Sequence, residues 1–254
     1  MTEEILKTIK NIEQENNVKI LYACESGSRA WGFASPDSDY DVRFIYIRPL
    51  DQYLTVFDDQ RDVIELPIDD LLDVNGWDFK KSLNLLHKNN FALFEWLHSP
   101  VVYMDLGIST RLQKLVKESF RHDRGHYHYL AMSKGIYDQH IKDRETPGIK
   151  KLFYVLRTLC CCLWIEKYKT MPPVEFSELL KEKFLPEEIV TEINLLREEK
   201  KVKNEKDPAE NCSRTVKYIA KELIRLEKLQ PPMVQIDRDK VDGTFREILN
   251  EYNF

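Results

Sequence analysis

The segment from residue 27 to residue 43, GSRAWGFASPDSDYDVR, constrains the fold of this chain more than any other. The apolar run VKILYA precedes it, and a second apolar run, residues 41–47, begins inside it and continues past its end. Each run has the length and composition of a buried strand. A glycine that directly follows one strand, with aspartates at alternate positions entering the next, is more typical of a ligand site than of an ordinary turn.

Alternation along the second strand predicts which side chains share a face. Asp39, Asp41 and Arg43 are expected on one side, with Tyr40 and Val42 on the other. Two carboxylates on one strand face lie within about 7 Å of each other and raise each other's pKa unless a cation lies between them. A hard, oxygen-ligated cation such as Mg²⁺ would remove this repulsion. We therefore predict a metal site at Asp39 and Asp41.

Gly27 and Ser28 predict a phosphate site beside the metal. A glycine at a strand end lets a ligand approach the backbone closely, and Ser28 can cap the turn that follows it, so that backbone N–H groups point at an anion. Asp37 is interpreted differently, because the sequence SPDS at 35–38 is an ordinary turn.

Composition limits the class of protein. A chain of 254 residues with 43% hydrophobic residues can bury a substantial core, and its net charge of -5 excludes a polycationic nucleic-acid binder but not a local basic surface. The charged N-terminus lacks the apolar region of a signal peptide, and no segment is as long and apolar as a membrane span, so we expect a cytoplasmic protein without membrane contact. The five cysteines fit buried, reduced thiols.

The chain changes character along its length. Before about residue 80, helix and strand signals alternate, with strands expected near 18–23, 41–47, 62–66 and 71–77. From about residue 80 onward nearly every segment has helical periodicity. This order predicts a sheet domain with packed helices, followed by an all-α region, with a boundary at residues 105/106.

The motif resembles that of a known family. Gly27-Ser28, ten residues, then Asp39-Tyr40-Asp41-Val42 resembles the signature of the DNA-polymerase-beta nucleotidyltransferase superfamily. The longer string ESGSRAWGFASPDSDYDVRFIY, with GWDFKK and EWLHSP, is similar to its RNA-repair-associated branch (RlaP). In the helical half, KKLFYVLRTLCCCLWIEKYKTMPP resembles the Tyr-x-x-Arg helix and Pro-Pro turn of the same branch.

The resemblance implies an α+β fold and a three-carboxylate site. Residues 1–105 would form a polymerase-beta-like nucleotidyltransferase core with a mixed sheet and flanking helices, and residues 106–254 an all-α domain that closes the nucleotide cleft. Asp39 and Asp41 would hold two Mg²⁺ ions, with Mn²⁺ as an alternative, while Gly27 and Ser28 contact the triphosphate.

A third acid from a later strand would complete the site. Asp73, between Leu72 and Val74, is preferred, and Glu65 is the competitor, because strand order does not follow from sequence. Asp78 is expected instead to cap the helix that begins at Phe79.

Four further side chains are candidates for nucleotide binding. Arg29 and Arg43 can neutralise triphosphate charge, although Arg43 can equally pair with its aspartate neighbours. Tyr154 and Arg157 fall on the polar face of a helix, opposite its leucines, where they can stack on a base and bind phosphate or simply face solvent.

These residues, together with the resemblance, predict an enzyme that transfers a nucleoside monophosphate from a nucleoside triphosphate such as ATP to an acceptor hydroxyl, with release of pyrophosphate. The resemblance implies an RNA end, tRNA included, as the first expectation for the acceptor, and a protein side chain or small molecule is the second. The alternative is a non-catalytic nucleotide-binding or antitoxin-like interaction protein.

Overall fold

The structure, a computed structural model, describes residues 1–57, 61–68, 71–202, 204, 207–229 and 238–252. The chain forms two compact units. The first contains residues 1–27, 39–119 and 235–254, and the second contains residues 28–38 and 120–234.

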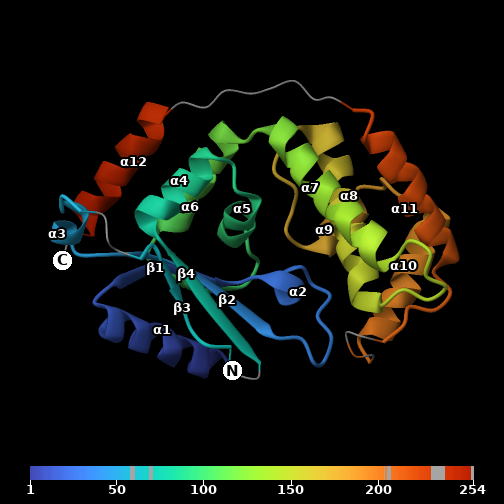
Figure 1. Cartoon of the computed structure of the whole chain (residues 1–254), viewed down its shortest axis with the longest axis horizontal. Helices are drawn as coiled ribbons and strands as arrows, with labels where there is room; N and C mark the ends of the chain where they lie inside the picture. The colour runs from blue at the N-terminus through green and yellow to red at the C-terminus, as the bar shows by residue number, and fades with distance from the viewer. Residues whose placement is uncertain (58–60, 69–70, 203, 205–206, 230–237, 253–254) are drawn as a thin grey trace. The chain divides into compact units, whose positions relative to one another are not determined.

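The first unit is built on a five-stranded sheet with the order β3-β4-β2-β1-β5 (Figure 1). The strands are β1 (Lys19–Glu25), β2 (Tyr40–Ile47), β3 (Val63–Glu65), β4 (Leu72–Asp78) and β5 (Val102–Asp105). β2 and β4 run parallel, whereas the pairs β1–β2, β1–β5 and β3–β4 are antiparallel. The sheet is therefore mixed, as the α+β prediction required.

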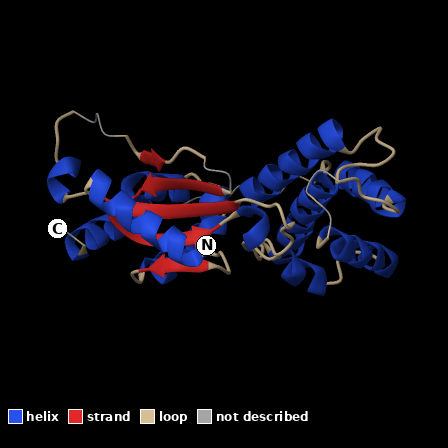
Figure 2. Ribbon diagram, turned by 90° about the horizontal axis from the view of Figure 1, so that it is seen from below, coloured by secondary structure: helices blue, strands red, loops and turns tan. Residues whose placement is uncertain are grey.

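Helices cover both faces of this sheet. Figure 2 shows α1 (Thr2–Asn16) against one face, where Ile5, Ile9 and Ile12 pack with Val42 and Phe44 of β2. The helices α4 (Phe79–His87), α5 (Phe91–Leu97) and α6 (Ile108–Ser119) lie on the other face, and α12 (Arg238–Glu251) packs against α4. Because both faces are covered, β2 is apolar on both sides along its second half, which explains its continuous FIYI run.

The sequence did not predict strand β5. β5 pairs antiparallel with β1, with Cys24 opposite Val102 and Tyr22 opposite Asp105, and forms an edge of the sheet. A four-residue strand between a Ser-Pro turn and a helix gives too short an alternation to recognise. The short helix α3 (Leu50–Tyr53) after β2 is equally brief.

The second unit is helical, which confirms the all-α expectation for the later part of the chain. Besides the short helix α2 (Gly27–Ala30), which begins at the last residue of the preceding part of the first unit, its helices are α7 (His122–His140), α8 (Ile149–Tyr168), α9 (Phe176–Lys181), α10 (Glu187–Lys200) and α11 (Ser213–Leu226). α7 and α8 form its core, and α8 buries the three adjacent cysteines 160–162 as thiols. The expected boundary at residues 105/106 stays a prediction. The two compact units are divided after residue 119, and α12 belongs to the first unit.

The central part of the signature segment belongs to the second unit. The Phe33 ring lies 5.4 Å from the ring of Phe153 and 5.9 Å from that of Phe176. The ammonium of Lys200, a buried residue, donates a 2.5 Å hydrogen bond to Ser35 Oγ. The chain therefore leaves the sheet after Glu25, packs among the helices of the second unit over residues 28–38 through its aromatic side chains, and re-enters the sheet at Tyr40.

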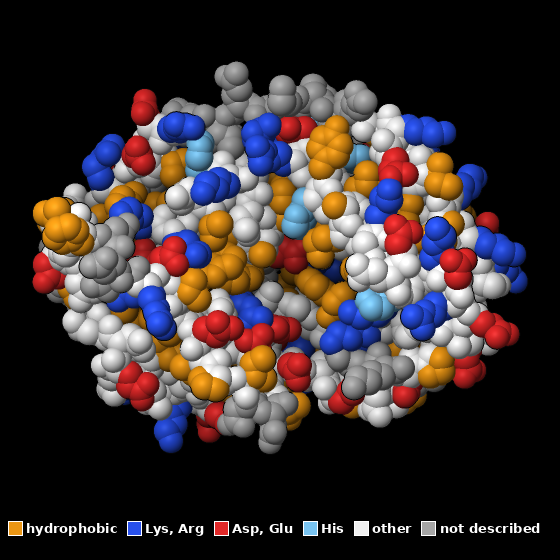
Figure 3. Space-filling model, viewed as in Figure 1, with side chains coloured by type: hydrophobic (Ala, Val, Ile, Leu, Met, Phe, Trp, Pro, Cys, Tyr) orange, Lys and Arg blue, Asp and Glu red, His pale blue; other side chains and the backbone are white. Residues whose placement is uncertain are grey.

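Two further properties concern the surface. Among the helices of the described residues, none combines the length and apolar character needed to cross a membrane. On the face seen in Figure 3, Lys and Arg side chains are interspersed with Asp and Glu, in agreement with the small net charge of -5.

Candidate active site at the start of β2 and β4

Two of the predicted carboxylates lie side by side in the sheet. The parallel register of β2 and β4 places Asp41 directly opposite Asp73. Both residues are near the amino ends of their strands, and their side chains are 28% and 27% exposed. The sheet thus brings together two acids that are 32 positions apart in the sequence.

Arg43 bridges these two carboxylates. Its Nη2 atom lies 2.8 Å from Oδ1 of Asp41 and 2.7 Å from Oδ2 of Asp73, and its Nη1 atom donates a hydrogen bond of 2.9 Å to the Asp73 carbonyl. Arg43 and Asp41 share a strand face, as alternation predicted, so the guanidinium fork reaches both acids. Of the two interpretations of Arg43, the structure contains the ion pair, with Asp73 as the second partner.

Gly27 packs directly on the Asp41 carboxylate. Its backbone has φ +60, and a Cβ atom placed on it would lie 2.0 Å from Oδ2 of Asp41. The neighbouring Ser26 N–H donates a 2.8 Å hydrogen bond to the Asp41 carbonyl. A glycine is therefore required here both by the left-handed backbone and by the close approach of the carboxylate.

Glu25 is a residue of this site that the sequence analysis missed. It is 1% exposed, its Oε1 atom accepts a 2.8 Å hydrogen bond from the Asp41 N–H, and its Oε2 atom accepts one from the Tyr103 hydroxyl. Ser99 Oγ donates to the Glu25 carbonyl at 2.6 Å. The signal was an acid at the end of an apolar strand, which must find hydrogen-bond partners if buried. Glu25 fixes the start of β2 and so the position of Asp41.

The remaining acids are placed differently. Asp39 precedes β2 and is exposed. Glu65 lies on β3 and pairs with Asn75 of β4, so β4 separates Glu65 from β2. Of the two candidates for the third carboxylate, the sheet therefore places Asp73, and not Glu65, beside Asp41.

The donor set of Asp41 and Asp73 fits a divalent metal in its chemistry. Their oxygens are the ligands that Mg²⁺ prefers, and the Arg43 guanidinium marks a position between them where positive charge is accommodated. In the described ranges, no three His, Cys, Asp or Glu side chains are gathered closely enough to hold a metal as they stand. Asp39, Asp41 and Asp73 therefore do not form a three-carboxylate cluster in this structure.

Asp78 has the structural role that its sequence position predicted. Its Oδ1 atom accepts a 2.8 Å hydrogen bond from the Lys80 N–H at the start of α4, and its Oδ2 atom accepts one of 2.8 Å from the Tyr53 hydroxyl. Burial raises the pKa of the Asp78 carboxyl above its ordinary value. The prediction of a helix cap is confirmed.

Ser28 and Arg29 belong to the second unit, with the rest of the segment 28–38. Ser28 is 4% exposed, and its carbonyl accepts a 3.1 Å hydrogen bond from the Phe33 N–H. Arg29 Nη2 donates a 2.7 Å hydrogen bond to the Ser38 carbonyl, across the base of the loop. Both residues shape this loop, and their contact with a nucleotide stays a prediction.

Tyr154 and Arg157 of α8 are less exposed than the helical pattern suggested. Arg157 is 2% exposed, its guanidinium lies 4.5 Å from the centre of the Trp31 ring, and its Nε atom donates a 3.1 Å hydrogen bond to the Val174 carbonyl. Tyr154 meets the same Trp31 ring edge-on at 5.0 Å. The expected polar helix face is corrected for Arg157, because the segment that carries Trp31 covers it. Nucleotide binding by either residue stays a prediction.

Two individual proteins are similar to this chain. A protein of Bacillus subtilis (strain 168), described as uncharacterized protein YcgL, is 40% identical over 251 residues, which cover 98% of this chain and 96% of that protein. A nucleotidyltransferase-like protein from Exiguobacterium sibiricum 255-15, solved as a crystal structure, aligns with 14% identity and a TM-score of 0.31, over 98% of this chain and 80% of that chain.

A protein family covers almost the whole sequence. The family described as "RlaP: RNA repair pathway DNA polymerase beta family" matches residues 1–249. That range includes the Gly27 turn, the paired Asp41 and Asp73, and the helical unit. This chain belongs to the RlaP family of DNA-polymerase-beta-like proteins, which is associated with an RNA repair pathway.

Proposed function

We propose that this protein is a Mg²⁺-dependent nucleotidyltransferase. It transfers a nucleoside monophosphate from a nucleoside triphosphate to an acceptor hydroxyl and releases pyrophosphate. The observation that carries the proposal is the in-register placement of Asp41 and Asp73, with Gly27 packed on the Asp41 carboxylate. Membership of a polymerase-beta family supports it.

Asp39, Asp41 and Asp73 are the residues that would hold the metal, with Mn²⁺ as a substitute for Mg²⁺. When bound, two such ions supply charge stabilisation on the attacking and leaving oxygens of an in-line displacement. Arg43 must loosen its contacts with Asp41 and Asp73 for these oxygens to serve as ligands. A guanidinium released in this way is suited to a phosphate oxygen of the bound triphosphate.

Other groups of the chain bind and orient the reactants. The backbone at Gly27, with Ser28 and Arg29 after it, is proposed to contact the triphosphate, because a left-handed glycine lets phosphate oxygens approach main-chain N–H groups. Asp73 is proposed to face the acceptor. Its Oδ2 atom accepts from Arg43, and Oδ1 has no hydrogen-bond partner among the described residues, so it can take the proton of the attacking hydroxyl.

The acceptor is proposed to be an RNA end, tRNA included, in keeping with the RNA repair association of the family. A protein side chain or a small molecule is the second choice. Base contacts by Tyr154 and Arg157, closure of a nucleotide cleft by residues 106–254, and a cytoplasmic location belong to the same proposal.

The test is transfer of label from α-³²P nucleoside triphosphates, with Mg²⁺ and total RNA, by the wild type and three single variants. Asp41→Asn and Asp73→Asn should abolish transfer, because each removes one charged ligand while keeping its shape. Asp37→Asn, an exposed turn residue, is the matched control and should keep full activity. Transfer that persists in both the Asp41 and Asp73 variants would contradict the proposal.

A second candidate is a non-catalytic nucleotide-binding or antitoxin-like protein. The observation that favours it is the Arg43 bridge, in which one cation pairs with both Asp41 and Asp73. Titration calorimetry with Mg²⁺ and a non-hydrolysable triphosphate detects nucleotide binding, and the transfer assay then separates the two candidates. Binding without transfer to RNA, protein or small molecules from a cell extract would favour the binding protein.

A further inference from the structure

Apart from the carboxylate site, the first unit has a groove between α4 and α12, called the α4–α12 groove. It has a volume of about 630 Å³, within the usual range for ligand pockets. Both helices belong to the first unit, and α12 is held to α6 by ion pairs of Arg111 with Glu251 at 2.5 Å and of Lys240 with Glu118. The groove is therefore a feature of one compact unit.

Positive charge dominates the rim of the groove. Lys80 from α4, Lys88 directly after α4 and Arg238 from α12 line it, against a single carboxylate, that of Asp242. All four are exposed side chains. Lys80 lies in the first turn of α4 and Lys88 directly follows its last turn, which separates their Cα atoms by about 12 Å along the helix axis. A local cationic excess in a chain of net charge -5 is a specific feature of this surface.

The floor of the groove is apolar and carries an aromatic ring. Leu83 and Val241 are buried there, and Phe245 is half-buried. The Phe245 ring lies 6.0 Å from the ring of Phe79 and 5.8 Å from that of Tyr53, in tilted and edge-on arrangements. These neighbours support one side of the Phe245 ring. An aromatic ring beside cationic side chains is the arrangement on which unpaired bases stack.

Polar atoms able to recognise a base edge also line the groove. His87, the last residue of α4, lines the groove. Its Nδ1 atom is buried inside the protein and does not face the open groove. The exposed amide of Asn84, one turn earlier on α4, offers both a donor and an acceptor.

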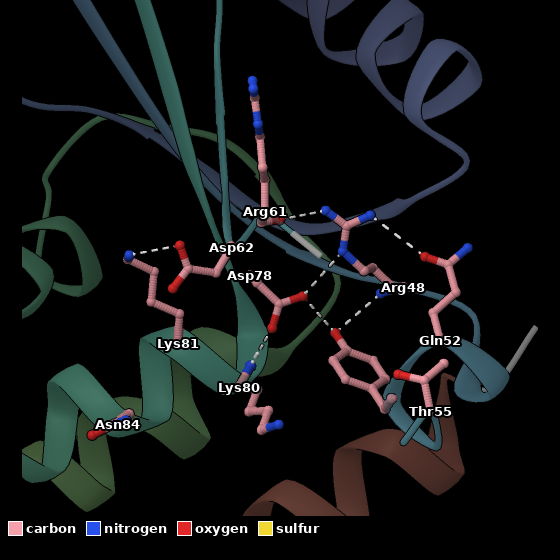
Figure 4. A pocket seen from close by; sticks show the side chains of 10 residues that line it. Arg48, Gln52, Thr55, Arg61, Asp62, Asp78, Lys80, Lys81 and Asn84 are labelled. Carbon is pink, nitrogen blue, oxygen red and sulfur yellow. Dashed lines mark hydrogen bonds and ion pairs between the residues drawn. The ribbon is translucent and has the colours of Figure 1, made fainter. Parts of the chain in front are cut away.

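The adjoining pocket in Figure 4 continues the positive surface past the start of α4. Lys80 and Asn84 line both cavities, and Arg61 and Lys81 line the second one. Inside that pocket most charge is already neutralised: Lys81 pairs with Asp62 at 2.9 Å, and an ion pair of 3.7 Å joins Arg48 to Asp78. We therefore assign ligand binding to the α4–α12 groove, with the pocket as its cationic margin.

We propose that the α4–α12 groove binds single-stranded RNA, with phosphates on Lys80, Lys88 and Arg238 and one base stacked on Phe245. The proposal deepens the proposed function and rests on it only for the choice of RNA as partner. Strand β4 connects Asp73 of the carboxylate pair to Asp78, which directly precedes α4, and this part of β4 is about 17 Å long. At about 3.4 Å per stacked nucleotide, an RNA segment of some five nucleotides has the same length. The groove would hold the body of an RNA whose end reacts elsewhere.

The experiment measures fluorescence anisotropy of a labelled 12-nucleotide single-stranded RNA with the full chain, without triphosphate or Mg²⁺. The variant Lys88→Glu with Arg238→Glu should bind at least about tenfold more weakly, and its plot of log Kd against log salt should be shallower by about 1.4, for two lost phosphate contacts. Phe245→Leu keeps an apolar packing group and should weaken binding about fivefold without changing the salt slope.

The matched control is Lys7→Glu with Lys10→Glu. These exposed lysines lie on α1, on the opposite face of the sheet from α4, and the two double variants change the net charge equally. The control should bind RNA as the wild type does, and circular dichroism checks that every variant is folded. Equal weakening in the control, or an α4–α12 variant within twofold of the wild type, overturns the proposal.

Competition with the labelled RNA identifies the chemical class of ligand that the groove binds. Unlabelled single-stranded RNA should displace the probe, whereas duplex RNA and AMP should compete at least about tenfold less well, because the groove stacks an unpaired base and contacts several phosphates. Equal competition by AMP would make this a mononucleotide site, and absence of RNA binding would leave the groove to a protein partner. Either result overturns the proposal.

The failure of this inference is distinguishable from failure of the proposed function. The variant Asp41→Asn with Asp73→Asn should lose nucleotidyl transfer and still bind RNA with wild-type affinity. Transfer without groove-dependent RNA binding overturns only the groove, and groove-dependent binding without transfer overturns only the enzyme.

Discussion

Asp41 and Asp73 lie directly opposite each other on two parallel strands, and one guanidinium nitrogen of Arg43 touches a carboxylate oxygen of each, at 2.8 and 2.7 Å. Two like charges are thus placed together by backbone pairing and held by an internal counter-ion. The same pairing that concentrates negative charge for a metal also makes the site dependent on Arg43 when no metal is bound.

Removing the Arg43 bridge should destabilise the fold. Arg43→Ala leaves two adjacent carboxylates without their cation, and we expect the free energy of unfolding at pH 7 to fall by about 1–2 kcal/mol, because the group is only partly buried. Chemical denaturation at pH 7 measures it.

A surface pair provides the comparison for Arg43. Lys81→Ala removes an ion pair with Asp62, whose side chain is 59% exposed, and should change the free energy of unfolding by less than about 0.5 kcal/mol. Equal effects of the two substitutions would mean that the Arg43 bridge contributes no more than an exposed pair.

Gly27→Ala should remove activity more than stability. The new Cβ atom would overlap Oδ2 of Asp41 and displace that carboxylate, so we expect transfer to fall by about 100-fold or more. Gly107→Ala is the control, because Gly107 also has a positive φ, of +92, but its Cβ position meets no atom within 4 Å. Both variants should lose about 1 kcal/mol of stability to backbone strain, and only Gly27→Ala should lose transfer.

Glu25 should act through its hydrogen bonds. Glu25→Gln keeps an acceptor for the Asp41 N–H but replaces the oxygen that accepts from Tyr103 by a donor, which should cost about 1–3 kcal/mol in the free energy of unfolding. Tyr103→Phe removes the same hydrogen bond by deleting its donor, so the double variant loses that bond only once. A double-mutant cycle should therefore give a combined loss smaller than the sum of the two single losses. Strict additivity would show that the two side chains are not coupled.

Acid should destabilise the helical unit through His126. Burial lowers the pKa of this histidine below 6.5, and its Nε2 atom lies 3.1 Å from the Leu226 carbonyl. The unfolded chain then binds more protons than the folded one between the lowered pKa and 6.5. The free energy of unfolding should therefore fall as pH decreases through that window, by up to about 1.4 kcal/mol per pH unit for this group.

Thermal denaturation between pH 5 and pH 8 tests the role of His126. His126→Gln keeps a donor for the Leu226 carbonyl and should flatten this part of the pH dependence. His140→Gln, in the last turn of α7, is the control and should leave the wild-type curve unchanged. An unchanged slope in the His126 variant would contradict the assignment.

The sequence by itself determined the elements that depend on local patterns. Period-two alternation located β2 and set Arg43 on the same face as Asp41. Helical periodicity located α1, α7, α8 and α11, and the position of Asp78 before an apolar helix identified its cap. These features follow from residues close together in the chain.

Only the tertiary structure decided which acid stands beside Asp41. The sequence favoured Asp73 over Glu65 without excluding Glu65, and the placement comes from the strand order β3-β4-β2, which depends on long-range pairing. The burial of Arg157 has the same origin, because a segment more than a hundred residues away supplies the Trp31 ring that covers it. The sequence determines which face of an element a side chain occupies, whereas its partner across the sheet or helix depends on packing between distant segments.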